Sequence, residues 1–181
     1  MRPHPGIPEI PTVTVTTIDS PLGPLLAVAD DDAIRALEFV KPATAVGQLE
    51  AMQAALGATL ERAAHPLLER LRSQLAEYFD GTRRTFDVPL RFTGTPFQER
   101  VWNRLLTIPY GEVRSYLDLA RELGDPKVVR AVGGANGSNP ISILVPCHRV
   151  IGADGSIVGY GGGLERKVWL LALERGERRL F

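Results

Sequence analysis

The sequence predicts a mixed α/β fold of the α+β type, with an antiparallel β-sheet in the first half and mostly helices in the second. Residues 12–40 supply three segments rich in β-branched and apolar residues, separated by turn signals. Residues 46–56 and 66–79 have helical spacing, and several helix-start motifs follow residue 95. Of the 181 residues, 44% are hydrophobic and 23% are charged, which indicates a globular protein with one large or two small domains.

Three strands are expected, at residues 12–19, 24–29 and 33–40. The last two flank the acidic turn DDD, and the three together predict an antiparallel meander. The second helix is amphipathic, because its apolar residues recur on one face: Leu67, Leu68, Leu71, Leu75, Tyr78 and Phe79. Residues 80–95 are interpreted as a connection, with a short strand near 85–90 and a domain boundary near residue 91.

The first eleven residues carry prolines at positions 3, 5, 8 and 11, and we expect a flexible arm at 1–11. This segment lacks the apolar centre of a secretory signal, and no apolar stretch in the chain approaches the length that spans a bilayer. The single cysteine cannot form an internal disulfide, which fits a reducing compartment. We therefore expect a cytoplasmic protein without a membrane segment.

Charge is distributed unevenly along the chain. Residues 1–90 carry 8 Lys and Arg against 12 Asp and Glu, whereas residues 91–181 carry 13 against 9. A basic second half permits binding to a polyanion. On charge alone, however, a solvated surface is the simpler interpretation.

Two capping boxes mark helix starts in the second half, TPFQ at 95–98 and SYLD at 115–118. The first helix should run to about residue 107, and the second should end at Gly124. Asp125 and Pro126 begin a further helix at once, as N-cap and first helical residue. Two helices joined by a three-residue turn with glycine have helix-turn-helix spacing, although many helical proteins contain such a corner without binding nucleic acid.

The helix that follows reads KVVRAVGGANG, residues 127–137, and its small residues leave one face nearly bare. Two adjacent glycines inside a helix cost roughly 1 kcal/mol each relative to alanine, so they require a reason. One interpretation is close packing on another backbone. The other is contact with a flat or narrow ligand, with Arg130 projecting from the middle. Readout of base edges is not expected, because a recognition helix normally carries several long polar side chains.

The only cysteine, Cys147, follows an apolar run at 141–145 that predicts a short strand leading to it. His148 comes next and could reach the thiol directly or through a water, while Glu174 could orient that histidine as in a hydrolase triad. The glycine-rich loop at 159–163 could bring backbone N–H groups close to a ligand. Without such neighbours, a buried and inert cysteine is the simpler interpretation.

The motif PCHRVIG, preceded by RAVGGANGSNPISILV and followed by GYGGGLERK, resembles the O6-alkylguanine-DNA alkyltransferases from TPFQERVW at 95 to WLLALE at 174. The first part of the chain resembles the family's ribonuclease-H-like domain. The resemblance implies such a domain at 12–91 and a DNA-binding, alkyl-transfer domain at 92–181. It implies direct-reversal DNA repair, in which an alkyl group moves irreversibly from O6 of guanine in duplex DNA to the protein's own cysteine. O4-alkylthymine is left open as a substrate.

The resemblance implies five catalytic residues. Cys147 matches the alkyl acceptor, His148 the base that activates it through a water, and Glu174 the carboxylate behind that histidine. Asn139 matches the asparagine that holds the active-site turn against the recognition helix. Tyr116 matches the tyrosine that helps to rotate the nucleotide out of the duplex and later gives the guanine a proton.

The resemblance also implies a set of DNA-binding residues on the helix-turn-helix. Arg130 matches the arginine that enters the duplex where the target base has left. Ala131 and Gly133 share the bare face, and Lys127 and Tyr116 complete the set. A bare helix face fits the narrow minor groove.

Five further residues match positions that bind the substrate. The carbonyl of Val150 matches the acceptor of the base's amino group, and Tyr160 with the backbone of Gly161 matches the loop that covers the base. Lys167 matches the lysine that ties this loop down. Ser142 stands in the pocket wall, where vertebrate members have proline.

No cofactor is expected. Some members bind zinc through cysteines and histidines of the first domain, and this chain has no cysteine there, so we predict no metal. The expected partner is double-stranded DNA with O6-alkylguanine, bound by a monomer; cooperative binding along DNA is left open. Three alternatives remain: a damage sensor without transfer activity, a cysteine hydrolase that turns over, and a redox-sensing cysteine, which would usually need a resolving partner.

Overall fold

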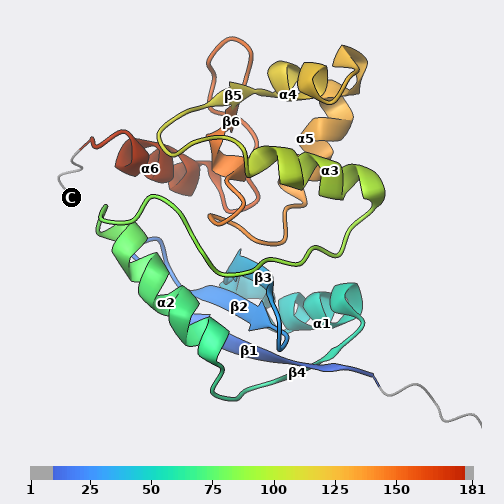
Figure 1. Cartoon of the computed structure of the whole chain (residues 1–181), viewed down its shortest axis with the longest axis vertical. Helices are drawn as coiled ribbons and strands as arrows, with labels where there is room; N and C mark the ends of the chain where they lie inside the picture. Colours follow the sequence, from blue (N-terminus) through green and yellow to red (C-terminus); the bar gives the residue numbers. More distant parts are fainter. Residues whose placement is uncertain (1–9, 178–181) are drawn as a thin grey trace, which may run out of the picture.

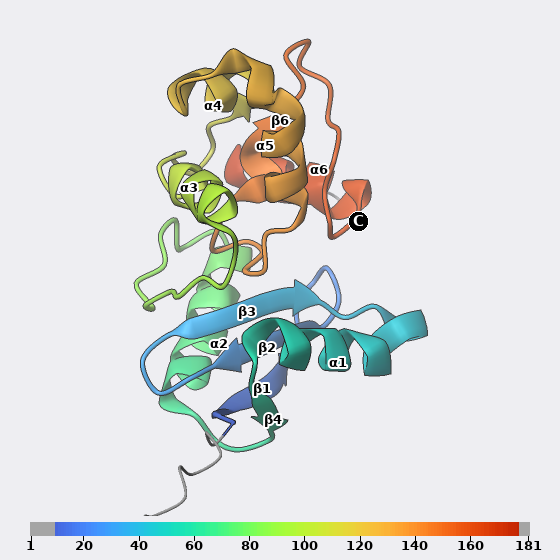
Figure 2. The ribbon, with the colours of Figure 1, turned by 90° about the vertical axis from the view of Figure 1, so that its right-hand side faces the viewer.

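The computed structural model describes residues 10–177, so most of the arm expected at 1–11 lies outside the described residues. Figure 1 shows two layers, with a β-sheet and its two helices in one and the remaining helices in the other. Figure 2 shows the same layers from the side. The mixed α/β fold class is confirmed. None of the described helices is long and apolar enough to cross a membrane.

The sheet has the strand order β3-β2-β1-β4, formed by β1 (Thr12–Ile18), β2 (Leu25–Ala29), β3 (Ile34–Phe39) and β4 (Thr59–Glu61). The first three strands form the antiparallel meander that the sequence predicts. The expectation of a purely antiparallel sheet is wrong, because β4 pairs in parallel with β1. This strand has only three residues, of which only Leu60 is partly buried, so its alternation is too short to detect in the sequence.

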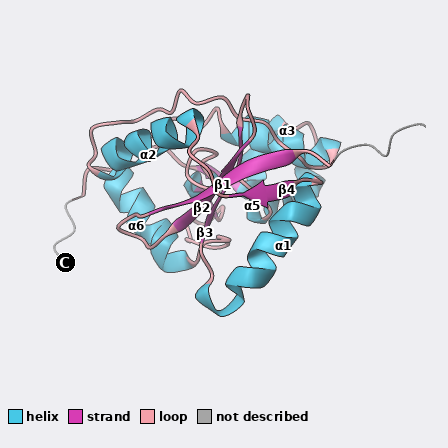
Figure 3. Ribbon diagram, turned by 90° about the horizontal axis from the view of Figure 1, so that it is seen from below, coloured by secondary structure: helices cyan, strands magenta, loops and turns pink. Residues whose placement is uncertain are grey.

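Helices cover both faces of the sheet, as the view from below shows (Figure 3). Helix α1 (Ala45–Leu56), preceded by the 3-10 turn η1 (Pro42–Thr44), covers a small core with Val15, Val28 and Met52. Helix α2 (Pro66–Phe79) covers the other face, and its apolar side chains share one core with the second half of the chain. Both helices start and end within one residue of the predicted bounds.

The second half consists of helices that are joined by short strands and turns: α3 (Pro96–Leu105), β5 (Arg114–Ser115), α4 (Tyr116–Glu122), η2 (Pro126–Val128), α5 (Val129–Gly137), η3 (Cys147–Arg149), β6 (Val150–Ile151) and α6 (Leu164–Glu174). Both predicted capping boxes are present, at Thr95 and Ser115. The helix-turn-helix is formed by α4, η2 and α5. The indole Nε1 of Trp102 donates to the carbonyl of Ala135 at 2.8 Å and fixes α3 against α5.

The free edge of β3 holds two distant segments. Ile34 N donates to Pro89 O at 2.8 Å, and Arg91 N donates to Ile34 O at 3.1 Å. These bonds make one isolated bridge, so the strand predicted near 85–90 is not formed. Further along β3, Leu37 N donates to the carbonyl of Pro140 at 2.8 Å, which ties the segment before Cys147 to the sheet.

The strand predicted at 141–145 is wrong, because this segment folds into a tight turn. Ile143 has a positive φ of 72°, and Val145 N bonds back to Ile141 O at 3.0 Å. The run is apolar because it is buried, not because it alternates between two faces of a sheet. A short strand does occur here, but it is β6, which follows the cysteine and pairs in parallel with β5.

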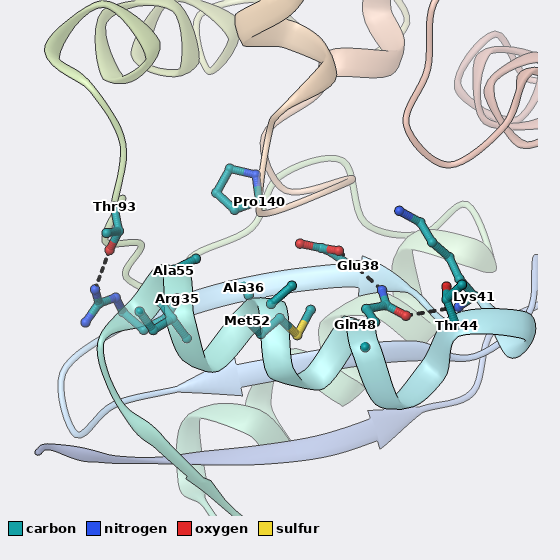
Figure 4. Close-up of a pocket in the computed structure, with 13 residues that line it drawn as sticks. Arg35, Ala36, Glu38, Lys41, Thr44, Gln48, Met52, Ala55, Thr93 and Pro140 are labelled. Carbon is teal, nitrogen blue, oxygen red and sulfur yellow. Dashed lines mark hydrogen bonds between the residues drawn. The ribbon is translucent and has the colours of Figure 1, made fainter.

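A groove of about 420 Å³ lies between α1, β3 and the connection that follows α2 (Figure 4). At one end, Gln48 accepts from Lys41 N at 3.0 Å and donates to Glu38 at 3.2 Å. At the other end, Arg35 Nη2 donates to Thr93 Oγ1 at 2.6 Å. The Gln48 bonds hold α1 against β3, and the Arg35 bond joins the sheet to the segment that leads into the second half.

Candidate active site

Cys147 begins the 3-10 turn η3 and is almost completely buried, with 3% of its surface exposed. Its Sγ accepts a hydrogen bond from Asn139 Nδ2 at 3.0 Å. The same amide closes the turn before the cysteine, because its Nδ2 donates to Val145 O at 2.9 Å and its Oδ1 accepts from Ile141 N at 3.0 Å. One side chain therefore both shapes the turn and contacts the sulfur.

His148 is fully buried and faces Glu174, with 2.8 Å between Nε2 and Oε1. A carboxylate can only accept, so Nε2 carries the proton and Nδ1 presents a lone pair. Within residues 10–177, Nδ1 has no hydrogen-bond partner. Burial lowers the pKa of His148, while the bond to Glu174 opposes this effect. The imidazole is therefore neutral at physiological pH, with a free basic nitrogen.

Glu174 receives further hydrogen bonds from three groups besides the histidine. Arg149 donates from Nε at 2.8 Å and from Nη2 at 2.9 Å, and the backbone N of Gly111 donates at 3.1 Å. The hydroxyl of Tyr78 donates to Oε1 at 2.7 Å. Although burial opposes ionisation, these donors hold the pKa of Glu174 far below its ordinary value, so the group is a carboxylate.

Burial raises the pKa of the Cys147 thiol to about 11. The bond from Asn139 and the charge of Lys167 favour the thiolate but do not outweigh desolvation. The thiol is therefore protonated in the resting protein. A nucleophilic sulfur needs a base at the moment of reaction, and His148 is the neutral base nearest in sequence.

Lys167 lies on α6 with no exposed surface. Its ammonium group donates to the carbonyls of Val150 and Val158, and to that of Gly159 at 3.1 Å. These bonds fix the glycine-rich loop at 159–163 to β6. The carbonyl oxygen of Val150 therefore accepts one hydrogen bond from Lys167. Burial lowers the pKa of Lys167 to about 8.

Two tyrosine hydroxyls lie near the loop. Tyr116 Oη donates to Gly159 O at 3.2 Å and accepts from Asn136 Nδ2 at 3.4 Å. The hydroxyl of Tyr160 is buried and has no partner among the described residues. Burial raises the pKa of both tyrosines, so both are protonated at neutral pH and can donate to a ligand.

Gly161 and Ser142 line a cavity of about 250 Å³ beside Asn139. A Cβ at Gly161 would lie 3.2 Å from Gly137 O at the end of α5, so the loop approaches that helix closely. Ser142 is 8% exposed, and its backbone N donates to Leu37 O at 2.8 Å. Strand β3 of the first half thus supports one wall of this cavity.

Of the five predicted DNA-binding residues, Tyr116 lies at this centre, whereas the other four lie on η2 and α5. Lys127, Arg130 and Ala131 are exposed on η2 and α5, and Gly133 is half-buried. A Cβ at Gly133 or Gly134 would meet no neighbour within 4 Å, counting the described residues beyond the helix's own backbone. Close packing on another backbone therefore does not explain the bare face.

Comparison with known proteins identifies the family. A family model described as "6-O-methylguanine DNA methyltransferase, ribonuclease-like domain" matches residues 13–92, and the "DNA binding domain" model of the same family matches residues 96–176. This chain belongs to the 6-O-methylguanine DNA methyltransferase family. The resemblance found in the sequence and the ribonuclease-like first part of the fold are thereby confirmed.

Relatives of this methyltransferase family resemble the chain over most of its length. The methylated-DNA–protein-cysteine methyltransferase of Mycolicibacterium paratuberculosis is 47% identical over 162 residues, 88% of this chain and 90% of the relative. The constitutive enzyme of Bacillus subtilis is 46% identical over 161 residues, 88% and 94% of the two chains. Mycobacterium tuberculosis O6-methylguanine methyltransferase has a crystal structure with 44% identity and a TM-score of 0.78, covering 92% of this chain and 95% of that one. Mycobacterium tuberculosis OGT in complex with DNA has 44% identity and a TM-score of 0.76, covering 92% and 94%.

The structure adds three residues that the sequence analysis missed. Arg149 is 7% exposed and is held by Glu174, and a charged residue inside an apolar, buried run was a detectable signal for it. Asn136 contacts Tyr116, but it stands among the glycines and alanines of α5, where only Arg130 attracted notice in the sequence. Tyr78 belongs to the apolar face of α2, and this spacing predicted only that its ring lies in the core.

Proposed function

We propose that this methyltransferase moves an alkyl group from O6 of guanine in duplex DNA to Sγ of Cys147, once per molecule. The observation that carries the proposal is the buried thiol, held by Asn139 next to a neutral His148 that is itself oriented by Glu174. Membership of the family and the DNA complex of a similar protein support it.

The reaction needs only a base, a nucleophile and an acid. The thiol proton passes through a water to His148 Nδ1, and the sulfur attacks the saturated alkyl carbon in line with the C–O6 bond. The S–C bond forms as the C–O6 bond breaks, and the departing guanine takes a proton from Tyr116. No tetrahedral acyl intermediate forms, so no oxyanion hole is needed. The product is a thioether, which water does not cleave, so the protein acts once.

O6 of guanine is inside the base stack, so the nucleotide must be rotated out at a cost of a few kcal/mol. The open face of α5 fits the minor groove, and Arg130 has the length and exposure to fill the gap. Tyr160 and the backbone of Gly161 would then cover the base. The amino group of the guanine would donate to the second lone pair of the Val150 carbonyl oxygen. Ser142 would form part of the pocket wall, and Lys167 would hold the glycine-rich loop at 159–163 in place.

The remaining assignments belong to the same proposal. The chain would form two domains: residues 12–91 with the β-sheet, and residues 92–181 with the DNA-binding and alkyl-transfer residues. The protein would act as a monomer on DNA that carries O6-alkylguanine, without a cofactor. A cytoplasmic location follows from the need to keep the Cys147 thiol reduced.

Mass spectrometry after mixing the protein with a duplex that carries one O6-methylguanine tests the proposal. Trypsin should release residues 131–149, and this peptide should gain one methyl group, stoichiometrically and only with the damaged duplex. Cys147→Ser, which is nearly isosteric, should bind the duplex and remain unmodified. Binding without modification of the native chain would indicate a damage sensor, and repeated turnover with an unmodified peptide would indicate a hydrolase.

A further inference from the structure

The carboxylate behind the histidine is held from both halves of the molecule. Its donors His148, Arg149 and Gly111 come from the second half of the chain. Tyr78 comes from α2 in the first half, 96 residues away in sequence, and its bond to Oε1 is the shortest of the set at 2.7 Å. The first half thus reaches the reactive centre through one hydroxyl group.

The Tyr78 side chain has no freedom to leave this position. It has no exposed surface, and its ring lies between aromatic neighbours, with centroid distances of 5.5 Å to Phe79, 5.4 Å to Phe86 and 6.0 Å to Tyr110. Edge-on and tilted contacts of this kind fix a ring in one orientation. A hydroxyl on a fixed ring donates in one direction, and here that direction is Oε1 of Glu174.

We propose that Tyr78 is a positioning residue for alkyl transfer: its hydroxyl fixes the oxygen of Glu174 that also receives the Nε2–H of His148. The proposal rests on the function proposed above, because it assigns His148 the role of base. Oε1 accepts from Tyr78, from His148 and from Arg149 Nη2, so each donor competes for the same negative charge. Tyr78 therefore holds the histidine's partner in place and limits how strongly that partner attracts a proton on the imidazole.

The direction of the effect follows from electrostatics. Without the Tyr78 hydroxyl, the charge on Oε1 is shared with fewer donors and stabilises a protonated His148 more strongly, so the pKa of His148 rises. The other groups facing the pair stay in place in such a variant. They come from η3, from α6, from the loop before β5 and from the glycine-rich loop: Arg149, Lys167, Tyr110, the backbone N of Gly111 and Tyr160.

Tyr78→Phe tests the proposal, because it removes the hydroxyl and keeps the ring. The matched control is Tyr110→Phe, which removes a hydroxyl from the same aromatic cluster that makes no hydrogen bond to Glu174 in the described structure. NMR titration of the imidazoles is tractable because the chain has only three histidines. The pKa of His148 should rise in Tyr78→Phe by on the order of half a pH unit, and not in Tyr110→Phe.

The second readout is the single-turnover transfer rate as a function of pH. In Tyr78→Phe it should be about three- to tenfold lower at neutral pH, with its acidic limb moved upward by the same shift as the titration. An unchanged pKa of His148, or equal changes in both variants, would overturn the proposal. A native protein that takes no methyl group from DNA would disprove the proposed function, whereas the NMR titration would still decide what Tyr78 does.

Discussion

The buried reactive centre and the outer face of α5 are built on opposite principles. At the centre, Glu174 is 6% exposed and accepts five hydrogen bonds, and Lys167 donates to three carbonyls. On α5, Arg130 is exposed and makes no ion pair with a described residue, and Gly134 has open space where a side chain would be. If the proposed function is right, the chemistry is organised before DNA arrives, whereas the proposed recognition surface on α5 is left unfilled.

This contrast predicts which property each substitution affects. Charged groups that satisfy one another in a buried cluster depend on every member, so losing one should destabilise the fold. Residues on an open surface have few internal contacts to lose, so substitution there should leave stability nearly unchanged and act on binding.

The largest expected effect is that of Glu174→Ala. It leaves the buried Arg149 guanidinium without its partner, which should lower the free energy of unfolding by about 3–5 kcal/mol. Urea denaturation measures the change. The control is Glu177→Ala, three residues further on, where the carboxylate is exposed and faces Arg175 at 3.4 Å. That substitution should change stability by less than about 1 kcal/mol. Equal losses of stability in Glu174→Ala and Glu177→Ala would contradict the difference drawn between the buried centre and the exposed surface.

The next effect is expected on the outer face. Arg130→Ala should slow alkyl transfer from duplex DNA by about tenfold to hundredfold, measured at protein concentrations that limit binding. No side chain then fills the gap left by the rotated base. Modification of Cys147 by iodoacetamide should stay at the native rate, because the substitution does not touch the buried centre. Arg121→Ala, an exposed arginine on α4, is the control and should have a much smaller effect on transfer. A loss of iodoacetamide reactivity in Arg130→Ala would show that the two regions are not separate.

Prediction from sequence succeeded where local chemistry decides the structure. The two capping boxes fixed the starts of α3 and α4, and apolar spacing fixed α2 along its whole length. For the small residues of α5 the sequence left two interpretations open, and only the open space at Gly133 and Gly134 argues against close packing. By contrast, the roles of the site residues came from the resemblance to a family, because a lone cysteine next to a histidine is weak evidence by itself.

Prediction failed where distant segments decide the structure. Residues 141–145 look like a strand, but Asn139 supplies side-chain bonds that close a turn, and β3 binds the turn's beginning. Tyr78 looks like one more apolar residue of α2, and only the folded chain brings its hydroxyl to Glu174. Although the Asn139 bonds are local, both cases include a contact between the two halves that no local pattern encodes.

The smallest expected effect tests whether the bare face of α5 lies against the DNA groove. Gly134→Ala should raise the free energy of unfolding by about 0.5–1 kcal/mol, because alanine favours a helix and its methyl group meets no neighbour. Affinity for duplex DNA, measured by fluorescence anisotropy, should fall slightly with alanine and much further with Gly134→Gln. Gly94→Ala should have the opposite effect on stability. The alanine Cβ would lie 2.5 Å from the Trp102 ring, so this substitution should destabilise the fold. If Gly134→Gln bound DNA as the native chain does, the glycines of α5 would need an explanation other than close contact with the groove.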